Sequence, residues 1–346
     1  MKQPIARNRI IVGDALNVLR TLPDESVDMI FTSPPYYNLR DYGIGKRRSE
    51  LGQEASIDQW ADNLTAVARE AWRVLVPTGS LWLNVGDTYS PGARHGAERK
   101  SLLLGPQRLA LRLVRGGWLL RNWIIWAKRN HLPSPVADRL TPAHEALLML
   151  TKQGNYYFDL NVIRVPHTSA PPPAPSRSRR TAGTGPKNRT DSRRPGDTLL
   201  GSKGLKAMRT QGRVGHLRGK NPGDVWQFNT SQYRGAHRAT MPVELARRAI
   251  AAACPELRCT ICRRPWRREQ VREVGHAALR PTCLCEADVE RGIVLDPFMG
   301  SGTTAVAAEQ LGRDWLGIEL NPDYAAEAME RIKAERDASP ERNEEI

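Results

Sequence analysis

Apolar and polar positions recur along the chain with two periods, and each period predicts one kind of element. Residues 58–76 carry apolar side chains at helical spacing and stop at Pro77-Thr78-Gly79, which predicts an amphipathic helix. Short β-rich apolar runs that end at glycine or proline predict buried strands. These patterns predict strands at 9–12, 27–31, 80–85, 119–126, 146–150, 292–295 and 315–319, and further helices at 15–22, 102–114, 242–253, 303–310 and 322–338.

The order of these elements indicates a fold class. Strands that alternate with helices of this length are typical of an α/β sheet with helices on both faces. The pattern stops at residues 167–223, which are rich in Pro, Gly, Ser and Arg and have few large apolar side chains. Such a segment cannot build its own core and is predicted to be a linker, a flexible binding insertion, or both.

Length and composition further limit the domain organisation and the location of the protein. The chain has 346 residues, 40% of them hydrophobic, which suits one large core with an insertion or two small domains. No run of about 18 apolar residues predicts a membrane helix, and no apolar signal segment follows Met1. We therefore expect a cytoplasmic protein that has no membrane partner.

Positive charge is concentrated in one part of the chain. The net charge is +15, and residues 167–222 hold thirteen Lys or Arg against two Asp, Asp191 and Asp197. A concentrated positive charge predicts a polyanionic partner, most often nucleic acid. The alternative is a surface that is basic for solubility alone.

A glycine turn follows the predicted strand at 292–295. In the sequence Leu295-Asp296-Pro297-Phe298-Met299-Gly300-Ser301-Gly302-Thr303-Thr304, the glycines let the backbone approach a ligand, and the helix start favours an anion. The next strand ends about twenty residues later at Glu319, where a carboxylate can accept hydrogen bonds from both hydroxyls of a ribose. The alternative is an ordinary helix start with a surface glutamate.

A second motif, Phe31-Thr32-Ser33-Pro34-Pro35-Tyr36, ends the strand at 27–31. Ser33 and the Pro34 carbonyl are candidate acceptors for the hydrogens of an exocyclic amine, whose lone pair must leave conjugation with its ring before it can react. Tyr36 is a candidate stacking platform for an extruded base. The alternative is a proline turn that closes a strand.

Together the two motifs resemble those of the S-adenosylmethionine-dependent DNA amino-methyltransferases. Their order resembles the beta group, in which the catalytic motif precedes the cofactor motif. The segments 12–14, 80–89, 139–145 and 237–242 are also similar to this group. The resemblance implies a circularly permuted class I methyltransferase fold, a Rossmann-like mixed sheet of the seven-stranded type. It further implies S-adenosyl-L-methionine as cofactor and double-stranded DNA as partner.

The resemblance also implies roles for individual residues. The base-binding and catalytic set is Ser33, Pro34, Pro35 and Tyr36. The cofactor-binding set is Asp14, Asp296, Phe298, Gly300, Ser301, Gly302, Thr303, Thr304 and Glu319. In this family Ser-Pro-Pro-Tyr usually accompanies methylation of cytosine N4, so we expect that base. The alternatives are adenine N6 and, more remotely, a non-catalytic zinc-containing DNA-binding protein. A cognate restriction endonuclease is an expected partner.

All five cysteines lie within about thirty residues. Paired thiolates at short spacing suit tetrahedral zinc, so Cys259, Cys262, Cys283 and Cys285 are the candidate ligands of a small zinc-ribbon-like clip with an arginine-rich hairpin and Trp266. Cys254 or His276 could replace one of them. The alternative is a set of reduced thiols beside the core.

Three further polar residues lie near the predicted site. His144 and Glu145 are expected to form a structural hydrogen-bonding pair, because the amine can lose its proton after methyl transfer and needs no strong base. Asp87 is a candidate for the wall of the site.

The predicted organisation has five parts. Residues 1–166 form the catalytic half, 167–223 the basic target-recognition insertion, 224–253 a cofactor-lining segment with a helix, 254–290 the cysteine-rich clip and 291–346 the cofactor-binding half.

Overall fold

A computed structural model describes residues 5–39, 51–167, 216, 218–231, 241–268 and 278–338. The chain divides into two units. The first comprises residues 1–163, 222–270 and 276–346, and the second comprises 164–221 and 271–275. Among the described residues of the second unit, Val165 and Lys220 form an antiparallel bridge. Most of the basic insertion lies outside the described residues.

The described part of the first unit is built on a mixed sheet of eight strands. Five neighbouring strands are parallel, β5 is antiparallel to both of its neighbours, and the edge strand β6 is parallel to β4. This confirms the predicted mixed α/β sheet and adds one strand, because residues 225–228 pair with β4. The spatial order is β1 (Arg9–Val12), β12 (Asp314–Glu319), β11 (Ile293–Asp296), β2 (Val27–Thr32), β3 (Leu75–Val85), β5 (His144–Thr151), β4 (Leu119–Lys128) and β6 (Val225–Phe228).

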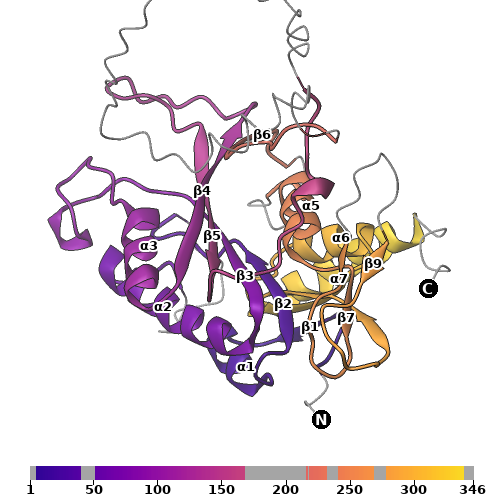
Figure 1. Cartoon of the computed structure of the whole chain (residues 1–346). Helices are drawn as coiled ribbons and strands as arrows, with labels where there is room; N and C mark the ends of the chain where they lie inside the picture. Colours follow the sequence, from indigo (N-terminus) through magenta and orange to yellow (C-terminus); the bar gives the residue numbers. More distant parts are fainter. Residues whose placement is uncertain are drawn as a thin grey trace, which may run out of the picture. The chain divides into compact units, whose positions relative to one another are not determined.

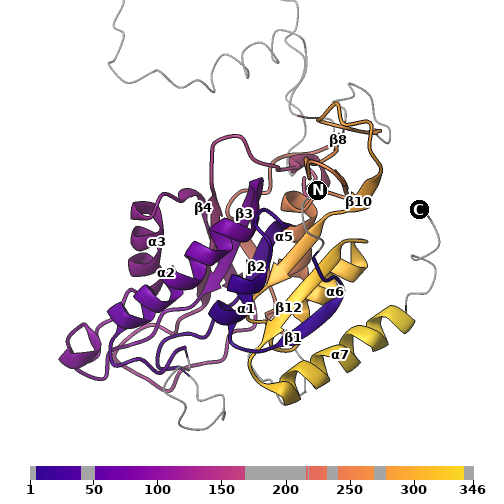
Figure 2. The same ribbon diagram turned by 90° about the horizontal axis from the view of Figure 1, so that it is seen from below.

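The two ends of the chain interleave in this sheet. The late strands β11 and β12 lie between the early strands β1 and β2, as the yellow and indigo strands of Figure 2 show. Val294 and Leu295 of β11 pair with Met29 and Ile30 of β2. The loops that follow β2 and β11 therefore start side by side, although they are more than 260 residues apart in the chain.

Helices cover both faces of the sheet, as predicted (Figure 1). One hydrophobic cluster joins the sheet to the first three helices, and a second joins it to the last three. The first face carries α1 (Ala15–Thr21), α2 (Ile57–Val74) and α3 (Gly105–Arg115), and the second carries α5 (Val243–Ala253), α6 (Thr303–Gln310) and α7 (Pro322–Asp337). The described part of the chain also contains two 3-10 turns, Ala93–His95 and Leu160–Val162.

Several element boundaries differ from the prediction, and three of them change which residues form a bulge or a helix cap. β3 begins at Leu75, directly after α2, because the stretch that includes Pro77 and Gly79 forms an irregularity in the strand rather than a loop. α3 begins at Gly105, where the Asp87 carboxylate accepts hydrogen bonds from the Leu104 and Gly105 amides. Pro242 is the N-cap of α5 and not part of its first turn.

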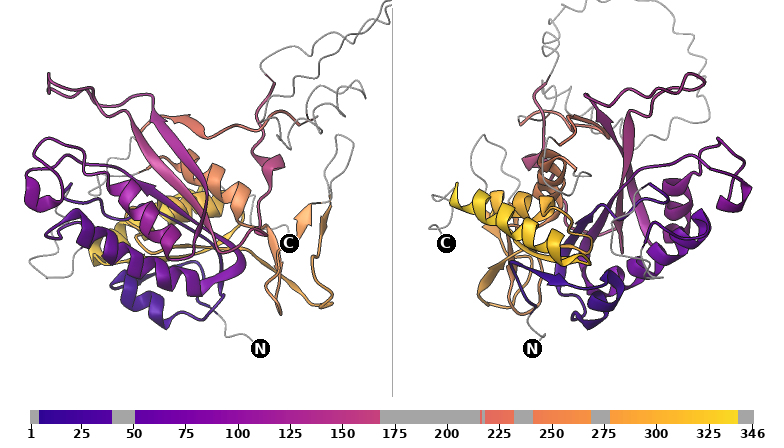
Figure 3. Two further views of the ribbon diagram at one scale, coloured as in Figure 1. Left: turned by 60° about the vertical axis from the view of Figure 1, so that its left-hand side comes forward. Right: turned by 180° about the vertical axis from the view of Figure 1, so that it is seen from behind.

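A small lobe of short strands lies between α5 and β11, coloured orange in Figure 3. In it β7 (Leu257–Cys259) pairs antiparallel with β10 (Val289–Arg291), and β8 (Arg267–Arg268) pairs antiparallel with β9 (Leu279–Arg280). The predicted arginine-rich hairpin is therefore confirmed at its base, and residues 269–277 lie outside the described part. Among the described helices, none is long and apolar enough to cross a membrane.

Candidate active site

The loops that follow β2 and β11 meet at one edge of the sheet, because the carboxyl ends of parallel strands lie together. Asp296 ends β11 and ties the two loops to each other. Its carboxylate accepts hydrogen bonds of 2.5 Å from the Thr32 hydroxyl and 2.5 Å from the Thr304 hydroxyl, and one of 3.0 Å from the Phe298 amide. Complete burial raises the pKa of Asp296 to about 6, against the opposite effect of these donors.

The glycine turn is shaped by backbone that favours glycine. Gly300 and Gly302 have φ values of +53° and +79°, and a methyl group at Gly302 would lie 3.1 Å from the Ile332 side chain. The turn ends where α6 begins at Thr303. The Gly300 amide donates a hydrogen bond to Glu319 at the end of β12, so the turn lies against the carboxyl edge of the sheet.

Glu319 stands at the end of β12 beside this turn. Its Oε2 accepts a hydrogen bond of 2.7 Å from the Gly300 amide, and its Oε1 accepts one of 2.9 Å from the Asn321 amide. The side chain is 9% exposed, and burial raises its pKa. The amides fix the orientation of the carboxylate and leave a second lone pair on each oxygen for a ligand.

One cavity of about 500 Å³ joins the two predicted motifs, and its size is typical of sites for small molecules. It is lined by most of the predicted residues: Asp14, Ser33, Pro34, Pro35, Tyr36, Phe298, Gly300, Ser301, Thr303 and Glu319. Asp296, Gly302 and Thr304 are not among its lining residues. Asp296 and Thr304 lie behind the wall, where their hydrogen bonds hold the loops.

The Ser-Pro-Pro-Tyr segment is fixed from several elements. Trp60 of α2 donates a hydrogen bond of 2.9 Å from its indole nitrogen to the Pro35 carbonyl. The Ser33 hydroxyl donates to the Tyr36 hydroxyl at 3.2 Å, and the Tyr36 hydroxyl donates to Glu145 at 2.6 Å. The Tyr36 ring lies against Gly86, where an added methyl group would be 2.7 Å from the ring.

The polar wall facing this segment was largely missed by the sequence prediction. Asn84 of β3 donates to the Tyr36 hydroxyl at 2.8 Å and to Glu145 at 2.7 Å. Lys128 of β4 forms an ion pair of 2.5 Å with Glu145. Asn84, Lys128 and Glu145 all line the cavity. Each of these three residues is an isolated polar position on its own strand, so no local sequence pattern marks it. The strand order β2-β3-β5-β4 brings the three together beside Tyr36.

Two expectations about neighbouring residues need correction. Glu145 has the predicted hydrogen-bonding role, but its partners are Tyr36, Asn84 and Lys128, while His144 before it on β5 is exposed. Asp87 does not line the cavity, because its carboxylate caps α3. Of the segment 237–242, residues 237–240 lie outside the described part, whereas Met241 lines the cavity.

The four predicted cysteine ligands gather in the small lobe. The sulfur atoms of Cys259, Cys262, Cys283 and Cys285 all lie within 4.8 Å of one another. Cys254 is not a member of this cluster: it ends α5, fully buried, with its carbonyl accepting a hydrogen bond from Arg313. His276, the other alternative, lies outside the described residues.

Comparison with known proteins agrees with this geometry. The chain is 34% identical over 344 residues to the type II methyltransferase M.Cfr9I of Citrobacter freundii, covering 93% of this chain and 87% of that one. The structure of PvuII DNA methyltransferase (cytosine-N4-specific) has a TM-score of 0.55 at 18% identity, covering 96% of this chain and 93% of its own. The protein TTHA0409 of Thermus thermophilus, complexed with S-adenosyl-L-methionine, has a TM-score of 0.51 at 25% identity and covers 95% of each chain.

The large mixed sheet and the cavity at its carboxyl edge define a methyltransferase fold of the α/β class. The model of the N6/N4 DNA methylase family matches residues 27–330, so the chain belongs to this family of amino-methyltransferases. It is an S-adenosylmethionine-dependent enzyme that acts on DNA.

Proposed function

We propose that the enzyme transfers the methyl group of S-adenosylmethionine to the N4 amine of a cytosine extruded from double-stranded DNA, at a specific sequence. The observation that carries the proposal is the single cavity shared by the glycine turn with Glu319 and by Ser33-Pro34-Pro35-Tyr36. A methyl donor and a target base must lie in one water-poor space for direct transfer, and catalysis is then mainly positioning and electrostatics.

The residues at the glycine turn fit a nucleoside cofactor. Glu319 would accept hydrogen bonds from the two ribose hydroxyls through the lone pairs that Gly300 and Asn321 leave free. Phe298 is half-buried in the cavity wall and offers an apolar surface to the adenine. Asp14 lines the same cavity while its Oδ1 caps α1 through the Asn17 amide.

The remaining predicted cofactor residues divide into two groups. Gly300, Ser301 and Thr303 line the cavity, and we assign them to direct contact with the cofactor. Asp296, Gly302 and Thr304 are assigned a positioning role, because they shape the turn from behind its wall.

The Ser33 end of the cavity suits an amine substrate. Bound S-adenosylmethionine supplies a methyl group on a sulfonium, and attack by the amine leaves S-adenosylhomocysteine. The hydroxyl hydrogens of Ser33 and Tyr36 are directed towards Tyr36 and Glu145 respectively. The lone pairs of the Ser33 oxygen are therefore available to accept a hydrogen from the amine, which would draw its nitrogen towards tetrahedral geometry.

The choice of cytosine rests on the identity of Ser33 in the Ser-Pro-Pro-Tyr motif. Adenine N6 is the competing target. The motif order, with the catalytic loop on β2 and the glycine turn on β11, is proposed to be a circular permutation of the fold.

We further propose that residues 167–223, with their net charge of +11 at 167–222, contact the DNA backbone and contribute to target recognition. We also propose that residues 1–166 form the catalytic half, 224–253 the cofactor-lining segment, 254–290 the cysteine-rich clip and 291–346 the cofactor-binding half. M.Cfr9I is named a type II methyltransferase, so a cognate restriction endonuclease is the proposed functional partner, and the cytoplasm the proposed location.

The test is methylation of unmethylated genomic DNA with labelled S-adenosylmethionine, followed by digestion to nucleosides and mass analysis. We expect N4-methylcytosine. N6-methyladenine would contradict the base assignment and leave the rest of the proposal intact.

Two variants test which end of the cavity serves methyl transfer and which end binds the cofactor. Both are measured in the same methylation assay and by cofactor binding. Ser33→Ala is expected to lose methylation about 100-fold or more while it still binds the cofactor. Glu319→Ala is expected to weaken cofactor binding at least about tenfold, because hydrogen bonds to a charged group are lost. If Ser33→Ala alone weakened cofactor binding, the assignment of the two ends would be wrong.

A further inference from the structure

The cysteine cluster of the small lobe is a built metal site that the methyl-transfer chemistry does not use. None of its four thiols lines the cavity, and all four sulfur atoms lie within 4.8 Å of one another. A tetrahedral zinc with Zn–S bonds of about 2.3 Å places its sulfurs about 3.8 Å apart, so small side-chain adjustments suffice. The ligands come from two segments: Cys259 ends β7 and Cys262 follows it, while Cys283 and Cys285 lie between β9 and β10.

We propose that one Zn²⁺ is bound tetrahedrally by these four cysteine thiolates, and that this metal clip fixes the amino-terminal end of β2, the strand that carries the Ser-Pro-Pro-Tyr motif. Four thiolate ligands leave no open coordination position, so the zinc is structural. Each thiol loses its proton when the metal binds.

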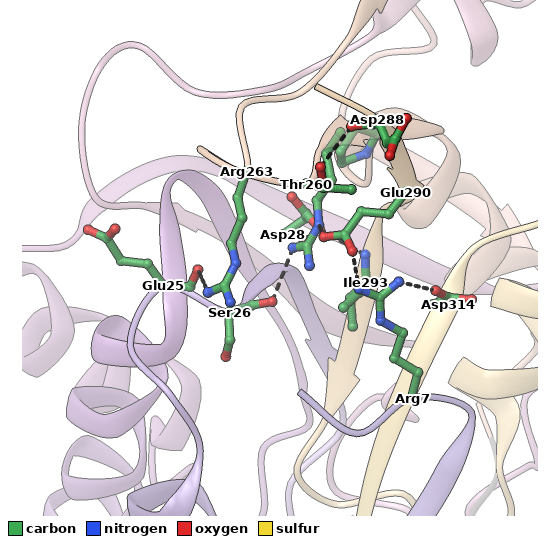
Figure 4. A network of polar contacts seen from close by, with 12 residues as sticks. Arg7, Glu25, Ser26, Asp28, Thr260, Arg263, Asp288, Glu290, Ile293 and Asp314 are labelled. Carbon is green, nitrogen blue, oxygen red and sulfur yellow. Dashed lines mark hydrogen bonds and ion pairs between the residues drawn. The ribbon is translucent and has the colours of Figure 1, made fainter. Parts of the chain in front are cut away.

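The first ligand pair is anchored to β2 and to the turn before it by its two neighbouring arginines, of which Figure 4 labels Arg263. Arg258, which precedes Cys259, is 1% exposed, forms an ion pair of 2.8 Å with Asp28 of β2 and donates a hydrogen bond to the Ser26 carbonyl. Arg263, which follows Cys262, donates hydrogen bonds to the Asp24 carbonyl at 3.2 Å and the Glu25 carbonyl at 2.6 Å.

β10, which follows Cys283 and Cys285 in the chain, pairs with β7, the strand that ends at the first ligand, Cys259. Val289 of β10 pairs with Cys259 of β7, and Glu290 forms an ion pair of 2.8 Å with Arg258. Glu290 also pairs with Arg7, which in turn forms an ion pair of 3.0 Å with Asp314 at the start of β12. The charged groups drawn in Figure 4 therefore join the clip to β2 and β12.

The arrangement explains why a metal is useful at this place. Buried charges are stable only when their partners stay in position. In its described part, the lobe has strands of two or three residues, and β pairings this short are only marginally stable by themselves. A zinc that joins residues 259–262 to residues 283–285 closes this lobe and keeps the ion pairs assembled.

The first experiment measures metal content and thiol reactivity of the full-length enzyme. We expect one zinc per chain by mass spectrometry. We also expect no fast-reacting thiol in the native protein, and five reactive thiols after denaturation with a chelator. Replacement by Co²⁺ should give the charge-transfer absorption of a tetrathiolate site. Protein purified with zinc present that contains none, or two disulfides after denaturation without a reductant, would overturn the proposal.

Variants test the ligand set. The double variant Cys283→Ser, Cys285→Ser should lose the metal and unfold at a lower temperature. Cys254→Ala, outside the cluster, is the matched control and should keep one zinc per chain. Retention of one tightly bound zinc by the double variant would contradict the assignment, and the metal content of the wild-type enzyme decides the matter if the variant does not fold.

A second pair of variants tests the coupling to β2. Arg263→Ala should keep its zinc but lower the thermal midpoint, because it removes the hydrogen bonds to the 24–25 turn. The neighbouring Arg264→Ala should keep its zinc and the wild-type thermal midpoint, since Arg264 has an exposed hydrogen bond to the Thr282 carbonyl at 3.4 Å. Equal midpoints for the two variants would disprove the coupling. Methylation is measured separately, so failure of the zinc proposal leaves the proposed function untouched.

Discussion

The Thr32 hydroxyl on β2 donates a hydrogen bond of 2.5 Å to the Asp296 carboxylate on β11. This bond joins Thr32, the last residue of β2, to Asp296, the last residue of β11 before the glycine turn. The two halves of the candidate site are thus connected by a buried contact beneath the cavity, between residues 264 positions apart.

Thr32→Val tests this connection, because valine keeps the shape of threonine and removes the donor. The variant should lose about 1–3 kcal/mol of unfolding free energy, since a buried carboxylate is left one partner short. Its KM for S-adenosylmethionine should also rise. Urea unfolding and initial rates measure the two effects. Thr65→Val is the control: its hydroxyl bonds the Ala61 carbonyl within α2, so KM should not change.

The raised pKa of Asp296 predicts a pH dependence of stability. The carboxyl binds its proton more tightly in the folded protein, where its pKa is about 6, than in the unfolded chain, where its ordinary value is 3.8. Its contribution to the unfolding free energy is therefore fully present below about pH 4 and is lost as the pH rises to about 6, by about 3 kcal/mol at most.

Asp296→Asn should lack this loss, so its stability relative to the wild type should increase between pH 4 and pH 6. Urea unfolding at several pH values measures it. Parallel profiles for the two proteins would refute the prediction. Asp138→Asn is the control: an exposed ion pair with Lys100 lowers the pKa of Asp138, so its small effect should have the opposite sign.

Tyr36→Phe keeps the ring but removes the hydroxyl that bonds Glu145 and Asn84. We expect kcat to fall about 10- to 100-fold, because a hydrogen bond to a charged group is lost beside Ser33, while cofactor affinity stays the same. Steady-state kinetics with both substrates measures this. Tyr37→Phe is the matched control, since Tyr37 bonds His95 and does not line the cavity. Equal losses of kcat in the two variants would contradict a specific role of the Tyr36 hydroxyl.

Gly86→Ala should displace the Tyr36 ring, because the new methyl group would lie 2.7 Å from it. Overlap at this distance forces a shift of the ring, so we expect kcat to fall at least about tenfold with little change in cofactor binding. Gly92→Ala is the control, because a methyl group there meets nothing within 4 Å. A fully active Gly86→Ala enzyme would show that the position of the ring does not limit the reaction.

The basic segment predicts a strong salt dependence of DNA binding. If it neutralises several phosphates, the logarithm of the binding constant should fall with the logarithm of salt concentration with a slope of about −4 or steeper. Replacing Arg177, Arg179 and Arg180 by alanine should reduce the slope, which fluorescence anisotropy measures. Alanine at Arg20, Arg69 and Arg115, which are exposed on α1–α3, is the control of equal charge. Equal slopes in both variants would assign the DNA contacts elsewhere.

The sequence by itself determined the local units of this protein. Strand, glycine turn and helix at 293–310 follow from an apolar run, two glycines and helical spacing, which act over a few residues. The candidate residues Ser33, Glu319 and the four clustered cysteines could be predicted for the same reason, because each belongs to a short motif. The start of β3 could not, because its irregularity depends on pairing with β2.

Only the tertiary structure decided which motifs share a cavity and what surrounds them. Asn84, Glu145 and Lys128 lie on three strands and have no common spacing in the chain. The register of β3, β5 and β4 places them next to Tyr36, and the insertion of β11 beside β2 brings Asp296 to Thr32. Their proximity depends on strand pairing across the whole sheet, and that pairing is set by the burial of both faces under helices rather than by any local run of residues.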